Sequence, residues 1–175
     1  IFRKNILSKP IVGFCGMSHL GISSALASIS RDFETICYDK DPKTVKKLKK
    51  NTLDIDEPFF NEILIKKNNF INFTNEIEIL KKCDLVYISL DIKTNNVGES
   101  NLTDVKQMIE DVISVLEKNQ ILIILSQVAP GFTKFYSKKF KNIFYQVETL
   151  IFGKAYERAM YPERYIIGCL NPHKE

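Results

Sequence analysis

The stretch at residues 11–27 constrains the fold of this chain more than any other. It reads Ile-Val-Gly-Phe-Cys-Gly-Met-Ser-His-Leu-Gly-Ile-Ser-Ser-Ala-Leu-Ala: an apolar run, a glycine turn, then small residues at helical spacing. This order predicts a buried strand, a tight turn and a helix over 19–30 whose N-terminus can hold a phosphate. The turn has the form Gly16-x-Ser18-x-x-Gly21, in which serine replaces the middle glycine of the dinucleotide-binding fingerprint.

Strand-like and helical segments alternate along the rest of the chain. Strands are expected at 10–15, 34–38, 70–73, 84–90, 120–126, 142–147 and 165–168. Helices are expected to begin at Pro42 and Pro58 and to cover 76–82, 102–118 and 130–140, with polar loops at 51–57 and 91–101. The alternation predicts an α/β fold: a Rossmann-like, doubly wound, mostly parallel sheet with helices on both faces.

Length and composition indicate one globular domain. With 175 residues, we expect a flexible arm at 1–9 and a single domain at 10–175. The net charge of +4 comes from dispersed lysines, and the densest run, 43–50, fits the wet face of a helix better than a nucleic-acid patch. No apolar run approaches the ~20 residues of a membrane span. We therefore expect a cytoplasmic protein with no membrane or nucleic-acid partner.

The four cysteines point away from metal or disulfide chemistry. None forms a CxxC pair or lies at metal-ligand spacing from a histidine. Two of them, Cys15 and Cys37, sit inside apolar strand-like runs. We expect free thiols in a reducing compartment and no metal site.

Asp39 gives the glycine turn its context. It ends the second expected strand, roughly 20 residues after the turn, where the fingerprint places an acid. There it would accept hydrogen bonds from the adenosine ribose and repel a 2′-phosphate, which favours NAD over NADP, a preference that Lys40 weakens. The N–H groups of residues 17–20 would face the pyrophosphate. Asp39 as a simple strand-end turn residue remains an alternative.

Two residues of the turn have open roles. Ser18 either donates its hydroxyl to a phosphate or marks a decayed site. His19 lies at a helix N-terminus, which disfavours an imidazolium, so we do not interpret it as a catalytic acid. It either contacts a phosphate or is a surface residue that caps the helix.

Six ordered segments over 11–168 resemble the N-terminal domain of the UDP-glucose/GDP-mannose dehydrogenases. The matching segments are the fingerprint, Asp39-Lys-Asp-Pro-Lys-Thr-Val, Asp56-Glu57-Pro58 with Ile63-Leu64, the strand Val86 to Leu90 with the loop Asn95 to Leu102, Ser126-Gln-Val-Ala-Pro-Gly-Phe-Thr133, and Glu148 with Leu150, Gly153, Ala155, Pro162, Arg164, Ile167 and Gly168.

The resemblance implies a function. These enzymes oxidise the C6 alcohol of a nucleotide sugar to a carboxylate with two NAD, in polysaccharide biosynthesis. It implies a catalytic role for Glu148, which helps deliver water or a base. It also implies a cofactor site made of Gly16, Met17, Ser18, His19, Leu20, Gly21, Asp39, Lys40 and Ser126. The family's nucleophilic cysteine, most of its sugar pocket and its dimerisation helix follow this region. We therefore expect a domain that is inactive alone, without the C-terminal catalytic part, from a homodimeric enzyme.

The chain departs from the family pattern where the family does chemistry. Besides Ser18, the Thr-Pro pair after the 84–90 strand is Ile92-Lys93, the threonine after Ser126 is Gln127, and the proline before Glu148 is Val147. These departures keep open a degenerate domain that acts through a partner instead of binding nucleotide. Another NAD enzyme of related architecture, such as a hydroxyacid or 6-phosphogluconate dehydrogenase, is a further alternative.

Overall fold

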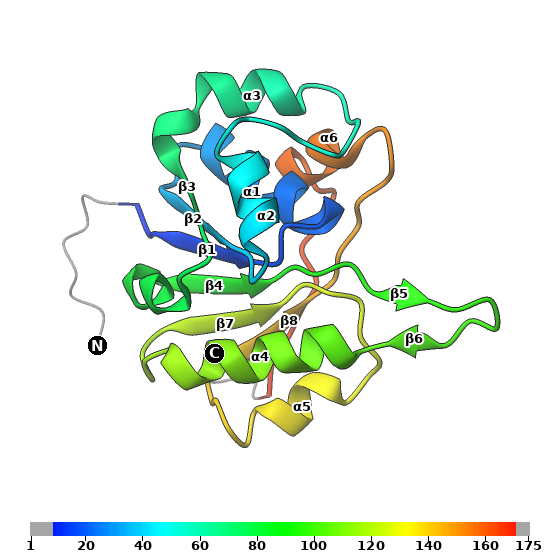
Figure 1. Cartoon of the computed structure of the whole chain (residues 1–175). Helices are drawn as coiled ribbons and strands as arrows, with labels where there is room; N and C mark the ends of the chain where they lie inside the picture. The colour runs from blue at the N-terminus through cyan, green and yellow to red at the C-terminus, as the bar shows by residue number, and fades with distance from the viewer. Residues whose placement is uncertain (1–8, 171–175) are drawn as a thin grey trace.

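The computed structural model of the chain describes residues 9–170, and within them seven strands form one sheet. The expected arm at 1–9 lies, except for Lys9, outside the described residues. The strand order is β3-β2-β1-β4-β7-β8-β9, and every neighbouring pair is parallel except β8 and β9 (Figure 1). The strands are β1 (Val12–Cys15), β2 (Thr35–Tyr38), β3 (Ile71–Thr74), β4 (Leu85–Ile88), β7 (Ile121–Ile124), β8 (Ile143–Gln146) and β9 (Ile167–Gly168).

Helices cover both faces of the sheet, as the doubly wound prediction requires. One face carries α1 (His19–Ser30), α2 (Pro42–Leu48), α3 (Phe60–Lys66) and α6 (Ala155–Met160) (Figure 1). The other carries α4 (Thr103–Val115), α5 (Phe132–Tyr136) and the 3₁₀ helix η2 (Ile77–Lys82). A second 3₁₀ turn, η1 (Asn68–Phe70), precedes β3. Each face buries its own apolar cluster, so the sheet lies between two cores.

Several local predictions are confirmed at the residue level. Helix α1 begins at His19 and ends at Ser30, as expected. Asp41 caps α2, since its carboxylate accepts the N–H of Lys43 and Thr44, with Pro42 in the first turn. Cys15, Cys37 and Cys83 are buried free thiols, and burial raises the pKa of each. Three thiols that are buried and held protonated are poor nucleophiles.

Other elements are shorter in the structure than the sequence predicted. The helix expected at 102–118 ends at Val115, because Leu116 already has extended backbone angles. The helix expected at 130–140 is confined to Phe132–Tyr136, and the segment at 76–82 is a 3₁₀ helix. The observed strands begin or end one or two residues inside the predicted ranges, except that β3 extends one residue further, to Thr74.

Some short elements were not predicted, among them a hairpin and a helix. The expected polar loop at 91–101 contains a short antiparallel hairpin, β5 (Lys93–Thr94) and β6 (Ser100–Asn101), whose turn is held by Asn95 Oδ1 accepting two backbone N–H groups. Helix α6 is only six residues long, and it packs against α1. A helix this short depends on tertiary packing, so its sequence carries little local signal.

Candidate functional site

The glycine turn between β1 and α1 is closed so tightly that side chains do not fit. Gly16 has φ +98°, and a Cβ added to Gly21 would lie 1.9 Å from the carbonyl oxygen of Gly16. In the parallel ladder Cys15 lies opposite Tyr38 and Ile88, so the carboxyl ends of β1, β2 and β4 share one edge. The turn therefore lies at the switch point where doubly wound sheets bind ligands.

Asp39 follows β2 and braces this turn. Its Oδ2 accepts the N–H of Met17 at 2.8 Å, and its Oδ1 accepts the N–H of Asp41 at 2.9 Å. The N–H of Met17, expected to face a pyrophosphate, is thus already engaged, whereas the carboxylate keeps lone pairs for further donors. Lys40 is exposed, and its ammonium lies 3.4 Å from Asp104 Oδ1 on α4.

Ser18 joins the turn to the end of β4. Its Oγ donates to the carbonyl of Ser89 at 3.1 Å and accepts the N–H of Asp91 at 2.9 Å. The hydroxyl has a single proton, which is therefore already donated to an acceptor within the chain. The serine that replaces the middle glycine is a bridge between two loops of the site.

Asp91 completes this bridge from the other side. Its Oδ2 accepts the N–H of His19 at 2.9 Å, which places a carboxylate on the first turn of α1. The dipole of the helix stabilises a negative charge there. The sequence prediction treated Asp91 only as the start of a loop. Its position directly after the apolar strand expected at 84–90 was the available signal.

The His19 ring faces Glu57 and not the open edge of the site. Its Nε2 lies 2.8 Å from Glu57 Oε1, and the ring stacks on Phe152 with centroids 4.5 Å apart. Buried Glu57 also accepts the N–H groups of Gly153 at 2.8 Å and Ala155 at 3.3 Å. Burial opposes ionisation of Glu57, but these hydrogen bonds and the His19 ring outweigh it and hold its pKa below the ordinary value.

Glu148 follows β8 on the same side of the site. Its Oε2 accepts a hydrogen bond from Gln127 Nε2 at 3.0 Å, and its Oε1 accepts the N–H of Leu150. Partial burial raises the pKa of Glu148; the Gln127 amide opposes this, and the charge of Asp91 adds to it. We call the group His19, Glu57, Asp91 and Glu148 the mouth of the site.

Ser126, also expected to contact cofactor, is fully buried. Its Oγ lies 2.7 Å from the carbonyl oxygen of Leu90 and 3.3 Å from that of Ile88. The hydroxyl therefore ties the end of β7 to the end of β4. Its role toward a cofactor stays a prediction.

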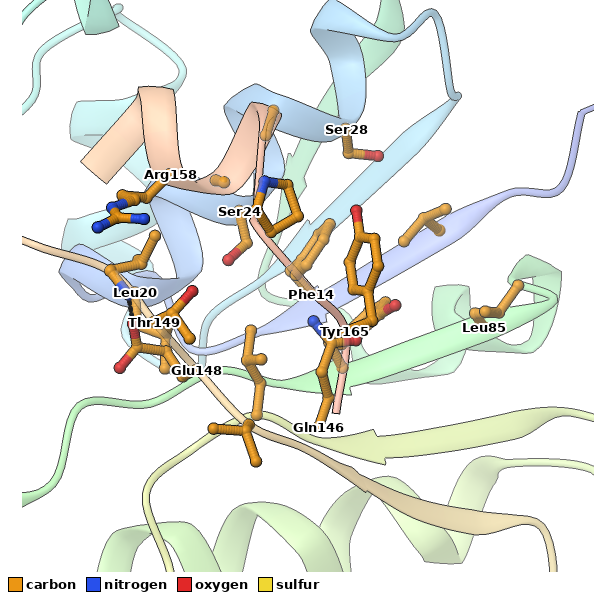
Figure 2. Close-up of a pocket in the computed structure, with 18 of the residues that line it drawn as sticks. Phe14, Leu20, Ser24, Ser28, Leu85, Gln146, Glu148, Thr149, Arg158 and Tyr165 are labelled. Atoms are coloured by element: carbon orange, nitrogen blue, oxygen red, sulfur yellow. Dashed lines mark hydrogen bonds between the residues drawn. The ribbon is translucent and has the colours of Figure 1, made fainter. Parts of the chain in front are cut away.

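A cavity of about 320 Å³ adjoins the mouth on the α1 face of the sheet. Figure 2 shows Leu20, Glu148 and Thr149 gathered at one end of it and Leu85 at the other. Ser24 and Arg158 reach it from α1 and α6. Among residues 9–170, no cluster of histidine, cysteine or acidic side chains is arranged to hold a metal, and no helix could span a membrane.

Comparison with known proteins decides between the alternatives of fold and family. Residues 11–175 match the family model described as "UDP-glucose/GDP-mannose dehydrogenase family, NAD binding domain". The chain belongs to this family. The resemblance seen in the sequence is thereby confirmed, and the cofactor of this domain family is NAD.

Curated relatives of the family are longer than this chain. The putative UDP-glucose 6-dehydrogenase YtcA of Bacillus subtilis is 28% identical over 168 residues, which are 90% of this chain and 38% of that protein. The UDP-glucose 6-dehydrogenase of Rickettsia conorii is 28% identical over 173 residues, 94% of this chain and 40% of that protein. The chain thus spans about two fifths of the length of these relatives.

Solved structures of family members share the fold. A UDP-D-ManNAc dehydrogenase from Pyrococcus horikoshii superposes with a TM-score of 0.82 at 20% identity, over 90% of this chain and 40% of that one. A GDP-mannose dehydrogenase from Pseudomonas aeruginosa gives 0.81 at 15% identity, over 91% and 41%. At these identities the likeness establishes the fold.

The shape of the turn fits NAD, but two of its backbone donors are already engaged. Gly16 and Gly21 form the tight turn that the fingerprint requires, and Asp39 stands at the ribose position of the fingerprint. The N–H of Met17 donates to Asp39, and the N–H of His19 donates to Asp91.

Proposed function

We propose that this chain is the NAD-binding part of a nucleotide-sugar 6-dehydrogenase that oxidises a sugar C6 alcohol to a carboxylate by two hydride transfers. The observation that carries the proposal is the tight turn from Gly16 to Gly21 beside Asp39, in a domain of the NAD-binding family. The proposal extends to a homodimeric, cytoplasmic enzyme of polysaccharide biosynthesis, for which the support is the family resemblance alone.

The residues of the turn would hold and orient the cofactor. Bound NAD supplies the hydride acceptor. The N–H of Leu20 and the positive end of α1 would face its phosphates, and Asp39 would accept its adenosine ribose hydroxyls. The negative charge of Asp39 would repel a 2′-phosphate, so the site would prefer NAD to NADP.

Glu148 would act at the reacting end of the site. Its raised pKa suits a carboxyl that exchanges a proton with a water or an alcohol, and the hydrogen bond from Gln127 orients it. The oxidation of an aldehyde to an acid also needs a thiolate to hold the carbon. Cys15, Cys37 and Cys83 are buried, and the family resemblance places the nucleophilic cysteine after Cys169. That thiolate and the rest of the nucleotide-sugar pocket would therefore come from another part of the enzyme.

Titration of this chain with NAD and NADP tests the proposal. We expect NAD to raise the free energy of unfolding by RT ln(1 + [L]/Kd), about 2.7 kcal/mol at a concentration of 100 Kd, and with it the melting temperature; NADP should have a smaller effect. Asp39→Asn, which keeps the shape of the side chain, should reduce the preference for NAD. The control is Asp54→Asn, because Asp54 pairs with Lys47 on the exposed surface. No shift with millimolar NAD would contradict the proposal.

A second candidate function is a folded domain that has lost nucleotide binding and acts through a partner. The contact that favours it is the hydrogen bond from the His19 N–H to Asp91, which uses a donor expected for the pyrophosphate. The same titration separates the two functions, because this candidate predicts no response to either nucleotide.

A further inference from the structure

Asp91 puts a carboxylate of the chain itself where the fingerprint holds a phosphate. The N–H of His19 is on the first turn of α1, and it donates to Asp91 Oδ2 at 2.9 Å. In dinucleotide-binding folds the pyrophosphate lies at this helix N-terminus. We propose that Asp91 occupies the pyrophosphate position of this domain and sets its affinity for NAD by competing with the cofactor. The inference rests on the proposed function.

Ser18 holds Asp91 in this position. The Ser18 hydroxyl accepts the N–H of Asp91 and donates to the carbonyl of Ser89, while the Asp91 carboxylate accepts the N–H of His19. Each loop therefore donates a hydrogen bond to the other, and we call this set of hydrogen bonds the clasp. A glycine at position 18 has no hydroxyl to form this clasp, so the departure in the middle of the fingerprint and the carboxylate at 91 act as one device.

The charges around the mouth oppose a second anion while Asp91 is in place. Asp39 stands on one side of the turn, and Asp91 is near enough to Glu148 to raise its pKa. The Lys40 ammonium is paired with Asp104, and the His19 ring is hydrogen-bonded to Glu57, so neither faces the N-terminus of α1 as a free partner. A pyrophosphate that entered would meet like charges at short range.

Asp91 is nevertheless a removable occupant. It is exposed and lies at the base of the exposed β5–β6 hairpin, outside both apolar clusters. Rotation of its side chain into water breaks one charge-assisted hydrogen bond at a helix N-terminus and disturbs no core packing. Such a bond contributes modestly, so we expect its loss to tighten NAD binding about fivefold to tenfold.

Calorimetric titration of NAD and of inorganic pyrophosphate into four variants tests this competition. Asp91→Ala removes the occupant, Asp91→Asn removes only its charge, Ser18→Gly opens the clasp, and Asp54→Asn controls for the loss of a remote surface charge. We expect Asp91→Ala to bind both ligands about fivefold to tenfold tighter than the unaltered chain, with Asp91→Asn and Ser18→Gly in between. Adenosine, which has no phosphate, should bind all variants alike. Circular dichroism melting verifies that each variant folds.

The outcomes separate this inference from the function on which it rests. If the unaltered chain binds NAD and neither Asp91 variant binds it more tightly, the competition is overturned and the NAD site stands. If the Asp91 variants bind NAD where the unaltered chain does not, the competition is supported, and the unaltered chain has the second candidate function. If no variant binds NAD or pyrophosphate, the NAD site itself is overturned and the inference falls with it.

Discussion

The glycine turn and the mouth meet at the N-terminus of α1, yet they depend on different forces. The turn is steric: the Cβ position of Gly21 lies 1.9 Å from a backbone oxygen. The mouth is electrostatic: Glu57, Asp91 and Glu148 are held by hydrogen bonds from backbone N–H groups and polar side chains. A steric requirement admits one residue type, whereas a polar network can be rebuilt with other partners. The comparison explains how a chain can keep Gly16 and Gly21 while its middle glycine becomes Ser18.

The largest expected effect comes from a substitution that disrupts the glycine turn. Gly21→Ala places a methyl group against the carbonyl oxygen of Gly16, and neither backbone segment can yield without moving α1 away from β1. Overpacking of this kind should lower the free energy of unfolding by about 3 kcal/mol, measured by urea denaturation. Ser24→Ala, on the same helix beside the cavity, should change it by less than about 0.5 kcal/mol. If Gly21→Ala left the free energy of unfolding unchanged, the steric explanation of the turn would be wrong.

The second-largest effect is expected when Glu57, in the mouth, loses its charge. Glu57→Gln should cost about 2 kcal/mol of unfolding free energy, because the N–H groups of Gly153 and Ala155 and the His19 ring lose a charged acceptor that is itself buried. The folded-state pKa of Glu57 is lowered, so its contribution is complete above the ordinary value of 4.5 and is lost as pH falls through the folded pKa.

Denaturation of both chains at several pH values checks this prediction. The difference between wild type and Glu57→Gln should be constant near neutral pH and shrink below about pH 4.5. Glu62→Gln is the control, because that carboxylate forms an exposed pair with Lys66. A difference that stayed constant down to pH 3 would show that charge is not what Glu57 contributes.

The contrast between the glycine turn and the mouth also explains which features the sequence could predict. The turn, Asp39 and the bounds of α1 follow from residues close together in the chain, and the fold follows from the alternation of strands and helices. The partners in the mouth do not: His19 contacts Glu57 and Asp91, 38 and 72 positions away. Such pairs form only after the strands are ordered in the sheet. Helix α6, whose first residues bind Glu57, likewise depends on packing against α1.

The smallest effect is expected at Glu148, with the opposite sign to Glu57. Its folded-state pKa is raised by partial burial, so the ionised group is penalised in the folded protein once pH rises through that pKa. Glu148→Gln removes the charge; its amide oxygen can accept the N–H of Leu150, and its amide nitrogen can donate to the Gln127 amide oxygen once that amide rotates. It should therefore stabilise the chain by about 0.5 kcal/mol at pH 7 and make no difference below the ordinary value of 4.5. Denaturation of the two chains at pH 4 and pH 7 measures the sign. A loss of stability at pH 7 would mean that the hydrogen bonds to the carboxylate outweigh its burial, and Glu148 would then resemble Glu57 and not a carboxyl poised to exchange a proton.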